Sequence, residues 1–129
     1  MRHPFIDFLI ERDFISANIG QHISEKTNYV REPIGMIAVN HGLLCPTQID
    51  RILDEQRTST KRFGDIAVEL DCLTREQVDR LIQIQEFRTS VAIAESLALA
   101  GVLSCEDAVQ YLGSFLVNNH EVAAMIAEG

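Results

Sequence analysis

A 24-residue segment occurs twice in this chain, and this duplication constrains the fold more than any other feature of the sequence. Residues 33–56 read PIGMIAVNHGLLCPTQIDRILDEQ, and residues 62–85, which begin 29 positions later, read RFGDIAVELDCLTREQVDRLIQIQ. The two segments align without a gap and are identical at nine positions. A unit of this size cannot bury its apolar face alone, so repeated units are expected to stack and to share a core.

Each copy has the pattern of a short helix, a turn and a second helix. In the first copy Ile34, Ile37 and Ala38 have helical spacing, and Gly42 follows as a left-handed C-terminal cap. The second copy has Asp71 at this position, and Asp tolerates the left-handed conformation less well than Gly. The same turn is nevertheless expected in both copies.

The second helix of each copy begins at an N-terminal signature. Thr74 is an N-cap residue, and Gln77, three residues later, completes a capping box. In the first copy Cys45 stands at the cap position, and Pro46 occupies the first helical position, where its missing N–H does no harm. Apolar residues then recur with a helical period in both copies, namely Ile49, Ile52 and Leu53 in the first and Val78, Leu81 and Ile82 in the second.

Two degenerate copies flank this pair, at 5–28 and 91–117. A shift of 29 residues toward the N-terminus places Asp13 at the position of Gly42, and a shift of 30 toward the C-terminus places Gly101 at the position of Asp71. Ser16 and Ser104 then fall at the cap positions. We therefore predict an all-α fold of tandem short helix-turn-helix repeats, with a period of about 29 residues, packed as one small helical domain over 1–129.

The charge of the chain limits its partners. The formal charge of −8 opposes non-specific binding to nucleic acid or to an anionic membrane. Residues 89–129 carry five acids and no Lys or Arg, whereas all 11 bases lie in the first 88 residues, so an anionic ligand is expected there. Aromatic residues make up only 6% of the chain, and the core is expected to be aliphatic.

The cysteines and the apolar stretches favour a cytoplasmic protein. Cys45, Cys72 and Cys105 show no metal-ligand spacing and are expected to be reduced and mostly buried. Asp7 and Glu11 interrupt the N-terminal apolar stretch, so we expect no signal peptide. The stretch SVAIAESLALAGVL at 90–103 is too short to span a membrane. We expect no metal, no nucleic-acid partner and no membrane insertion.

The paired segments resemble the MshEN family, which comprises N-terminal domains of bacterial type II secretion and type IV pilus assembly ATPases. Members of this family carry tandem 24-residue motifs with a five-residue spacer, which here is 57–61. Many of them bind cyclic di-GMP, with the two motifs lying along the elongated ligand. The resemblance therefore implies motif I at 33–56, motif II at 62–85 and cyclic di-GMP as a possible ligand, with no other cofactor.

The resemblance also implies a ligand-binding set drawn from both motifs and the spacer. Pro33 stands where motif I usually has Arg, although Arg31 lies two residues earlier, and Asp71 stands where motif II usually has Gly. The implied set is Ile34, Gly35, Gly42, Leu44 and Gln56 of motif I, Arg57 of the spacer, and Arg62, Phe63, Gly64, Leu73 and Gln85 of motif II.

The basic residues around the spacer have a chemical and a structural interpretation. Arg57, Lys61 and Arg62 place three positive charges within six residues of an acidic protein. Arg is suited to bidentate contact with a phosphate or a guanine edge. Basic runs are also common in solvated linkers, so this signal leaves both interpretations open.

The repeated glycines and glutamines are open to two interpretations as well. Gly35 and Gly64 at helix starts would let backbone N–H groups approach an anion, or would permit close helix packing. Gln56 and Gln85 would hydrogen-bond a base, or would be exposed helix ends. A repeated fold repeats its structural residues too, so repetition alone does not decide between ligand and scaffold.

No catalytic motif is present, and the phosphate-binding pattern Gly-x-x-x-x-Gly-Lys-Ser/Thr is missing. We expect a non-enzymatic, cytoplasmic regulatory module that senses cyclic di-GMP and acts on a secretion, pilus or motility ATPase or regulator. The alternative is a protein–protein adaptor or structural subunit that has lost nucleotide binding. Apolar residues near the C-terminus would complete the core or contact a partner, namely Val102, Leu103, Val109, Leu112, Phe115, Leu116, Val117 and Ile126.

Overall fold

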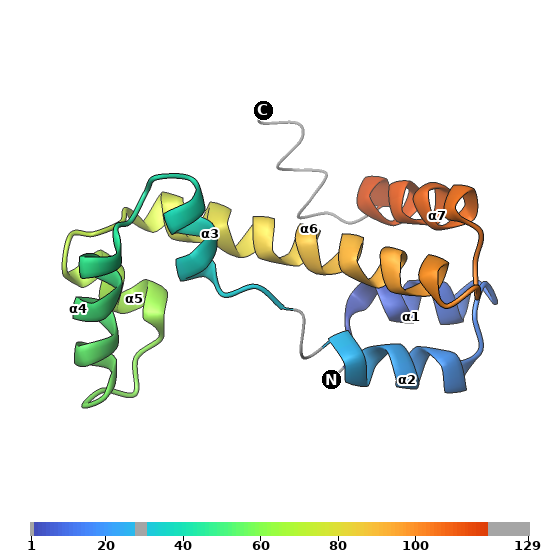
Figure 1. The fold of residues 1–129 in the computed structure, drawn as a ribbon, viewed down its shortest axis with the longest axis horizontal. Coiled ribbons are helices and arrows are strands. Elements are labelled where there is room, and N and C mark those ends of the chain that lie inside the picture. The colour runs from blue at the N-terminus through green and yellow to red at the C-terminus, as the bar shows by residue number, and fades with distance from the viewer. Residues whose placement is uncertain (1, 28–30, 119–129) are drawn as a thin grey trace. The chain divides into compact units, whose positions relative to one another are not determined.

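The computed structural model describes residues 2–27 and 31–118, and in these ranges the chain is entirely α-helical (Figure 1). The described residues contain no β-strand, which confirms the predicted all-α class. None of the described helices is long and apolar enough to cross a lipid bilayer. The helices are α1 (Pro4–Glu11), α2 (Ala17–Thr27), α3 (Ile34–Asn40), α4 (Pro46–Gln56), α5 (Phe63–Glu69), α6 (Arg75–Leu99) and α7 (Cys105–Asn118).

The helices pack as two compact units. Residues 32–85 form one, called here the 32–85 unit, and residues 1–31 with 86–129 form the other, called the terminal unit. Helix α6 continues through the boundary between them. The assignment of residues 1–129 to a single domain stays a prediction.

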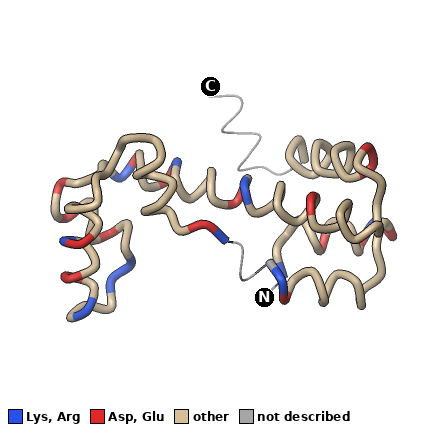
Figure 2. The backbone as a smooth tube through the Cα atoms, in the orientation of Figure 1, with Lys and Arg blue, Asp and Glu red and all other residues tan. Residues whose placement is uncertain are grey.

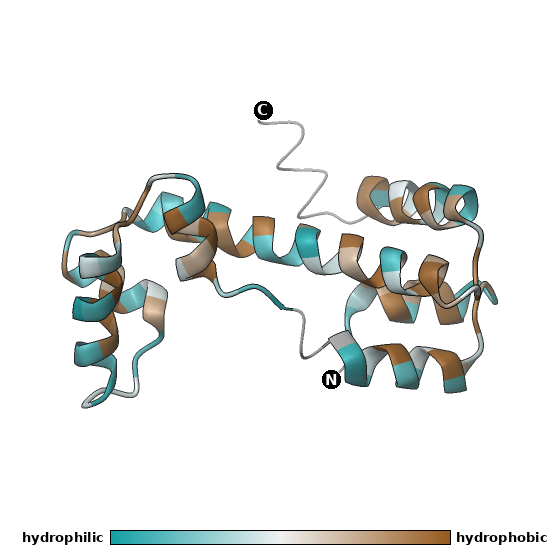
Figure 3. Ribbon diagram, viewed as in Figure 1, coloured by the Kyte–Doolittle hydropathy of each residue, from teal (hydrophilic) through white to brown (hydrophobic). Residues whose placement is uncertain are grey.

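The core of the 32–85 unit is aliphatic, as the composition predicted. It is built from α3, α4, α5 and the beginning of α6, and Ile37, Ala38, Ile52 and Ala67 are completely or almost completely buried. Apolar and polar residues alternate along these helices, as the brown and teal parts of the ribbon show (Figure 3). Further buried members of this core are Leu44, Ile66, Leu73, Val78 and Leu81.

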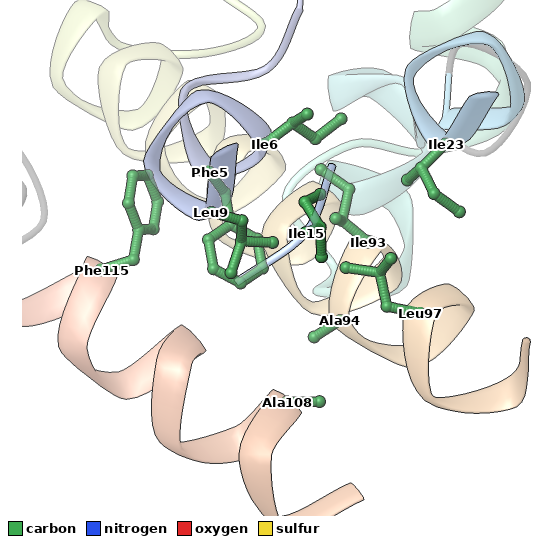
Figure 4. Packing of buried hydrophobic residues seen from close by; sticks show 10 residues of the cluster. All are labelled: Phe5, Ile6, Leu9, Ile15, Ile23, Ile93, Ala94, Leu97, Ala108 and Phe115. Carbon is green, nitrogen blue, oxygen red and sulfur yellow. The ribbon is translucent and has the colours of Figure 1, made fainter. Parts of the chain in front are cut away.

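The core of the terminal unit contains aromatic rings, so the prediction of an aliphatic core is wrong there. Phe5 of α1 and Phe115 of α7 are buried with aliphatic residues from α2 and α6 (Figure 4). At the rim, Phe14 and Tyr111 stack in parallel with ring centroids 3.7 Å apart. The chain contains few aromatic residues, and most of them gather in this one unit, which the average composition could not reveal.

The turns that follow four of the helical segments contain a residue in the left-handed conformation. Gly42 has a φ of 74°, as predicted for a C-terminal cap, and Gly101 has the same value. Asp13 and Asp71 adopt φ values of 59° and 57°, although a side chain makes this conformation costly. These residues lie 29, 29 and 30 positions apart along the chain.

The predicted helix caps are present. Thr74 Oγ1 accepts a hydrogen bond from the Gln77 N–H at 3.1 Å, and Gln77 Oε1 accepts one from the Thr74 N–H at 2.9 Å. In α4 the Cys45 N–H donates to Gln48 Oε1 at 2.9 Å. Ser16 and Ser104 hold the same cap position before α2 and α7, with Oγ accepting from backbone N–H groups at 3.2 and 3.0 Å.

Helix α6 is longer than the sequence pattern suggested. Its 25 residues join the second helix of motif II to the beginning of the degenerate copy at 91–117 without a break. The segment 75–99 contains no Gly or Pro to interrupt the helix. It does contain Arg-Thr-Ser at 88–90, the same three residues that begin the spacer after α4, so composition alone does not distinguish the two segments. The helix ends at Leu99, two residues before the left-handed Gly101.

Two expectations for individual side chains also change. Cys45 and Cys105 are exposed because they lie at helix starts, so the prediction of mostly buried cysteines is wrong for these two; Cys72 is partly buried. Near the C-terminus, Phe115 is buried and Val102, Leu103, Leu112 and Leu116 pack against the core of the terminal unit. Val109 and Val117 are instead 70% and 71% exposed, and Ile126 lies outside the described residues.

His3 is the N-cap residue of α1, and its capping hydrogen bond depends on the protonation state of the imidazole. Nδ1 accepts a hydrogen bond from the Phe5 N–H at 3.1 Å, and Nε2 lies 2.9 Å from Glu86 Oε2. Burial lowers the pKa of His3, and so does Arg31, whereas Glu86 and Asp7 favour the charged ring. Protonation of Nδ1 would remove the acceptor, so the cap requires the neutral imidazole.

We predict that stability falls with acidification through His3. Its pKa in the folded chain is below the ordinary value of about 6.5, so the unfolded chain takes up the proton first as pH falls. The contribution of His3 to the free energy of unfolding is full above about pH 6.5 and is lost as the pH falls through the lower pKa of the folded chain. In His3→Asn, Asn keeps a capping acceptor but does not titrate. Thermal melts between about pH 7 and pH 5 should therefore show a smaller loss in the variant. An NMR titration that gives His3 a raised pKa would contradict this.

We also predict that Asp71→Gly stabilises the chain. Gly adopts the left-handed conformation freely, so relief of the strain at a φ of 57° should add up to about 1 kcal/mol to the free energy of unfolding. Gly42→Ala is the matched control, because an added Cβ there would meet no heavy atom within 4 Å and tests backbone strain alone. Urea unfolding should show a loss of about 1 kcal/mol for this control. Equal stability of all three proteins would refute the strain argument.

Candidate functional site

All eleven residues of the predicted ligand-binding set lie in the 32–85 unit. Helices α3 and α5 supply the aliphatic–Gly and aromatic–Gly pairs at their N-terminal ends, and α4 and α6 supply the glutamines. The structure therefore brings the two motifs together in one compact unit. The contacts of each residue then show what it does within the fold.

The two glycines mark close and reciprocal helix packing. A Cβ added at Gly35 would lie 3.0 Å from Cζ of Phe63, and one at Gly64 would lie 3.6 Å from Cδ1 of Ile34. Each glycine thus faces the residue that precedes the other glycine. The Cβ added at Gly64 would also lie only 2.6 Å from Cγ1 of Val78. Both glycines are buried, which favours the packing interpretation over an open anion site.

The two glutamines also make reciprocal contacts. Gln85 Nε2 donates to the backbone carbonyl of Glu32 at 3.0 Å, two residues before α3 begins. Gln56 Nε2 donates to the carbonyl of Lys61 at 3.5 Å, two residues before α5 begins. Each glutamine therefore ties the end of one motif's second helix to the chain entering the other motif's first helix. In this structure they bond to the backbone, which sequence reasoning did not foresee because carbonyls carry no sequence signal.

The remaining apolar members of the set belong to the scaffold. Leu44 and Leu73 are 4% and 5% exposed and lie in the core. Ile34 and Phe63 are partly buried and pack against that core. Gly42 is exposed in the turn after α3. These side chains account for the fold of the double motif without requiring a ligand.

The basic residues around the spacer are mostly paired with acids; Figure 2 shows where basic and acidic residues lie along the backbone. Arg57 Nη1 lies 3.1 Å from Asp54 Oδ1, and the Lys61 ammonium pairs with the Glu69 carboxylate. The hydrogen bond and charge of Glu69 raise the pKa of Lys61, so this lysine is fully cationic at neutral pH. Arg62, the N-cap residue of α5, is exposed and has no ion-pair partner among the described residues.

The departures from the family pattern have clear places in the structure. Pro33 is the N-cap residue of α3 and is exposed. Arg31, which could replace the missing arginine of motif I, instead lies in the terminal unit with its Nη2 3.0 Å from Glu86 Oε1. Asp71 is exposed in the turn after α5. Of the set, Arg62 is therefore the side chain most available to an anion.

The part of the chain that the structure describes holds no cluster of His, Cys, Asp or Glu able to bind a metal ion. The repeated acids Asp50 and Asp79 are exposed on α4 and α6, beside Arg51 and Arg80. Arg80 pairs with Glu76 at 2.7 Å on the surface of α6. This polarity is typical of exposed helix faces.

We predict opposite effects for two Gly→Ala changes within helices. In Gly64→Ala the new methyl group would clash with Val78, and the expected cost of about 1–3 kcal/mol exceeds the gain in helix propensity. Gly113 in α7 is the matched control, because its added Cβ would meet nothing within 4 Å. Gly113→Ala should add about 0.5–1 kcal/mol to the free energy of unfolding. A similar gain in Gly64→Ala, measured by urea unfolding, would exclude the packing role.

Comparison with known proteins adds no further assignment. The chain matches no protein family model, no curated protein sequence and no solved structure. The resemblance to MshEN domains therefore stays a prediction.

Proposed function

We propose that this chain is a non-enzymatic regulatory module that acts by binding a protein partner, as an adaptor built on tandem helix-turn-helix repeats. The observation that carries this proposal is the internal use of the double motif. Glycines, glutamines and leucines of both motifs are occupied in packing and in backbone hydrogen bonds within the 32–85 unit. The motif thus serves as a scaffold, and its outer surface is what a partner would meet.

The placement of turns and caps supports the repeat organisation. Left-handed residues recur at intervals of 29, 29 and 30 positions, and helices α2, α4, α6 and α7 begin at the same intervals. Copies at 5–28, 33–56, 62–85 and 91–117 would explain this regularity. Arrays of this kind bind partners through the extended surface that their stacked repeats create.

Exposed apolar side chains indicate where a partner would bind the 32–85 unit. Leu53 on α4 and Ile82 on α6 are each 42% exposed, and they occupy the same position in the two motifs. Covering exposed apolar groups with a partner removes them from water, which favours binding. The partner class is the one implied by the MshEN resemblance, a secretion, pilus or motility ATPase or its regulator.

A second candidate function is the sensing of cyclic di-GMP, and the exposure of Arg62 favours it. This guanidinium lies beside the spacer at the N-cap of α5, without an acid partner among the described residues. An exposed Arg can bind phosphate or a guanine edge with two hydrogen bonds. The ligand would then regulate the same protein interaction.

Calorimetric titration with cyclic di-GMP separates the two candidates. The adaptor proposal predicts no heat and no thermal shift at high micromolar ligand. Binding by the parent that is lost in Arg62→Ala and retained in Arg51→Ala, an exposed arginine on α4, would instead establish the sensor.

A direct binding assay then tests the partner. Purified secretion, pilus and motility ATPases from the source organism should include one that binds the chain in biolayer interferometry. Leu53→Ser combined with Ile82→Ser should weaken that binding about tenfold or more, whereas Val109→Ser, an exposed apolar residue on α7, should not. If no ATPase and no cyclic di-GMP binds, the regulatory proposal fails.

A further inference from the structure

The terminal unit contains a concave apolar groove that the proposed function does not use. Its volume is about 550 Å³, within the range of small-molecule sites. Ile19 and Ile23 of α2 form one wall, and Leu99 at the end of α6 and Val102 in the following turn contribute to the other side. Leu99 is 89% exposed, so the groove presents a leucine that nothing in the described chain covers.

The groove extends along one face of α2. Its lining residues on that helix run from Asn18 to Lys26, which corresponds to about 12 Å along the helix axis. Ile19, His22, Ile23 and Lys26 recur at helical spacing, so they line the same side of the helix. The cavity is therefore elongated and has room for an extended hydrocarbon chain.

The polar groups of the groove favour an anion. Lys26 and His22 line it together with the apolar residues, and no Asp or Glu does. Lys26 has no ion-pair partner among the described residues. The positive charge of Lys26 attracts an anion locally in a chain whose formal charge of −8 would otherwise repel it. A ligand that fits has an apolar body and one negative group.

We propose that this groove binds a medium-chain fatty acid, with the hydrocarbon chain against Ile19, Ile23, Leu99 and Val102 and the carboxylate at Lys26. Binding would bury the exposed Leu99 side chain and would supply the lysine with a counter-ion. This site lies wholly in the terminal unit and is independent of the contacts proposed for the 32–85 unit. Binding of a fatty acid would then allow a small molecule to regulate the module.

Titration of the full chain with decanoate tests the site by calorimetry and by ¹⁵N chemical shifts. Backbone shifts are expected at 18–26 and 96–102 and not at 32–85. Lys26→Gln should weaken binding roughly fivefold, as expected for a partly exposed ion pair, and Leu99→Ser should weaken it by a similar factor. Lys61→Gln and Val109→Ser are matched controls, since each removes the same type of side chain outside the groove.

A second probe separates the contribution of the ligand's charge to binding from the contribution of its apolar chain. Decyltrimethylammonium has a comparable apolar chain and the opposite charge, so it should bind more weakly than decanoate. Equal affinity for the two probes, equal affinity of all variants, or shifts spread over 32–85 would each overturn the proposal. Absence of decanoate binding in the millimolar range would overturn it as well, without affecting the test of the ATPase interaction.

Discussion

The close approach of the two motifs at Gly35 and Gly64 is the contact on which the 32–85 unit depends. A Cβ on Gly35 would press against Phe63 of the other motif at 3.0 Å, whereas a Cβ on Gly64 would clash with Val78 of its own motif at 2.6 Å and would meet Ile34 at an ordinary contact distance of 3.6 Å. A methyl group at either position would fall within tight contact distance of a neighbouring side chain. Gly35 therefore permits the close approach of the two motifs, and Gly64 permits the close approach of α5 to α6.

The glutamine contacts complete this arrangement. Gln56 and Gln85 bind the carbonyls of Lys61 and Glu32, which precede the helices that carry the glycines. The bond to the Glu32 carbonyl is partly buried, where an unsatisfied acceptor would be costly, whereas the bond to the Lys61 carbonyl is exposed. The same residues that suggested a nucleotide site thus explain how two short helix pairs hold together. These contacts favour the scaffold interpretation, whereas the exposed Arg62 favours the sensor interpretation.

The terminal unit is stabilised by a different set of interactions. Its core combines aromatic and aliphatic residues from helices far apart in the sequence, and His3 caps α1 while lying beside Glu86. The groove beside α2 lies on this unit.

The sequence by itself determined the helical class, the left-handed turn at Gly42 and the cap formed by Thr74 and Gln77. These features depend on residues a few positions apart, so local pattern was sufficient. Only the tertiary structure decided that Gly64 faces Ile34, that Gln85 binds the Glu32 carbonyl and that Lys61 is paired with Glu69. It also decided the continuity of α6 and the groove at Leu99. The glycines and glutamines do repeat every 29 residues, but the repeat does not identify the atoms that each of them contacts. That depends on how the helices pack, which joins segments distant in the chain and uses backbone carbonyls that carry no sequence signal.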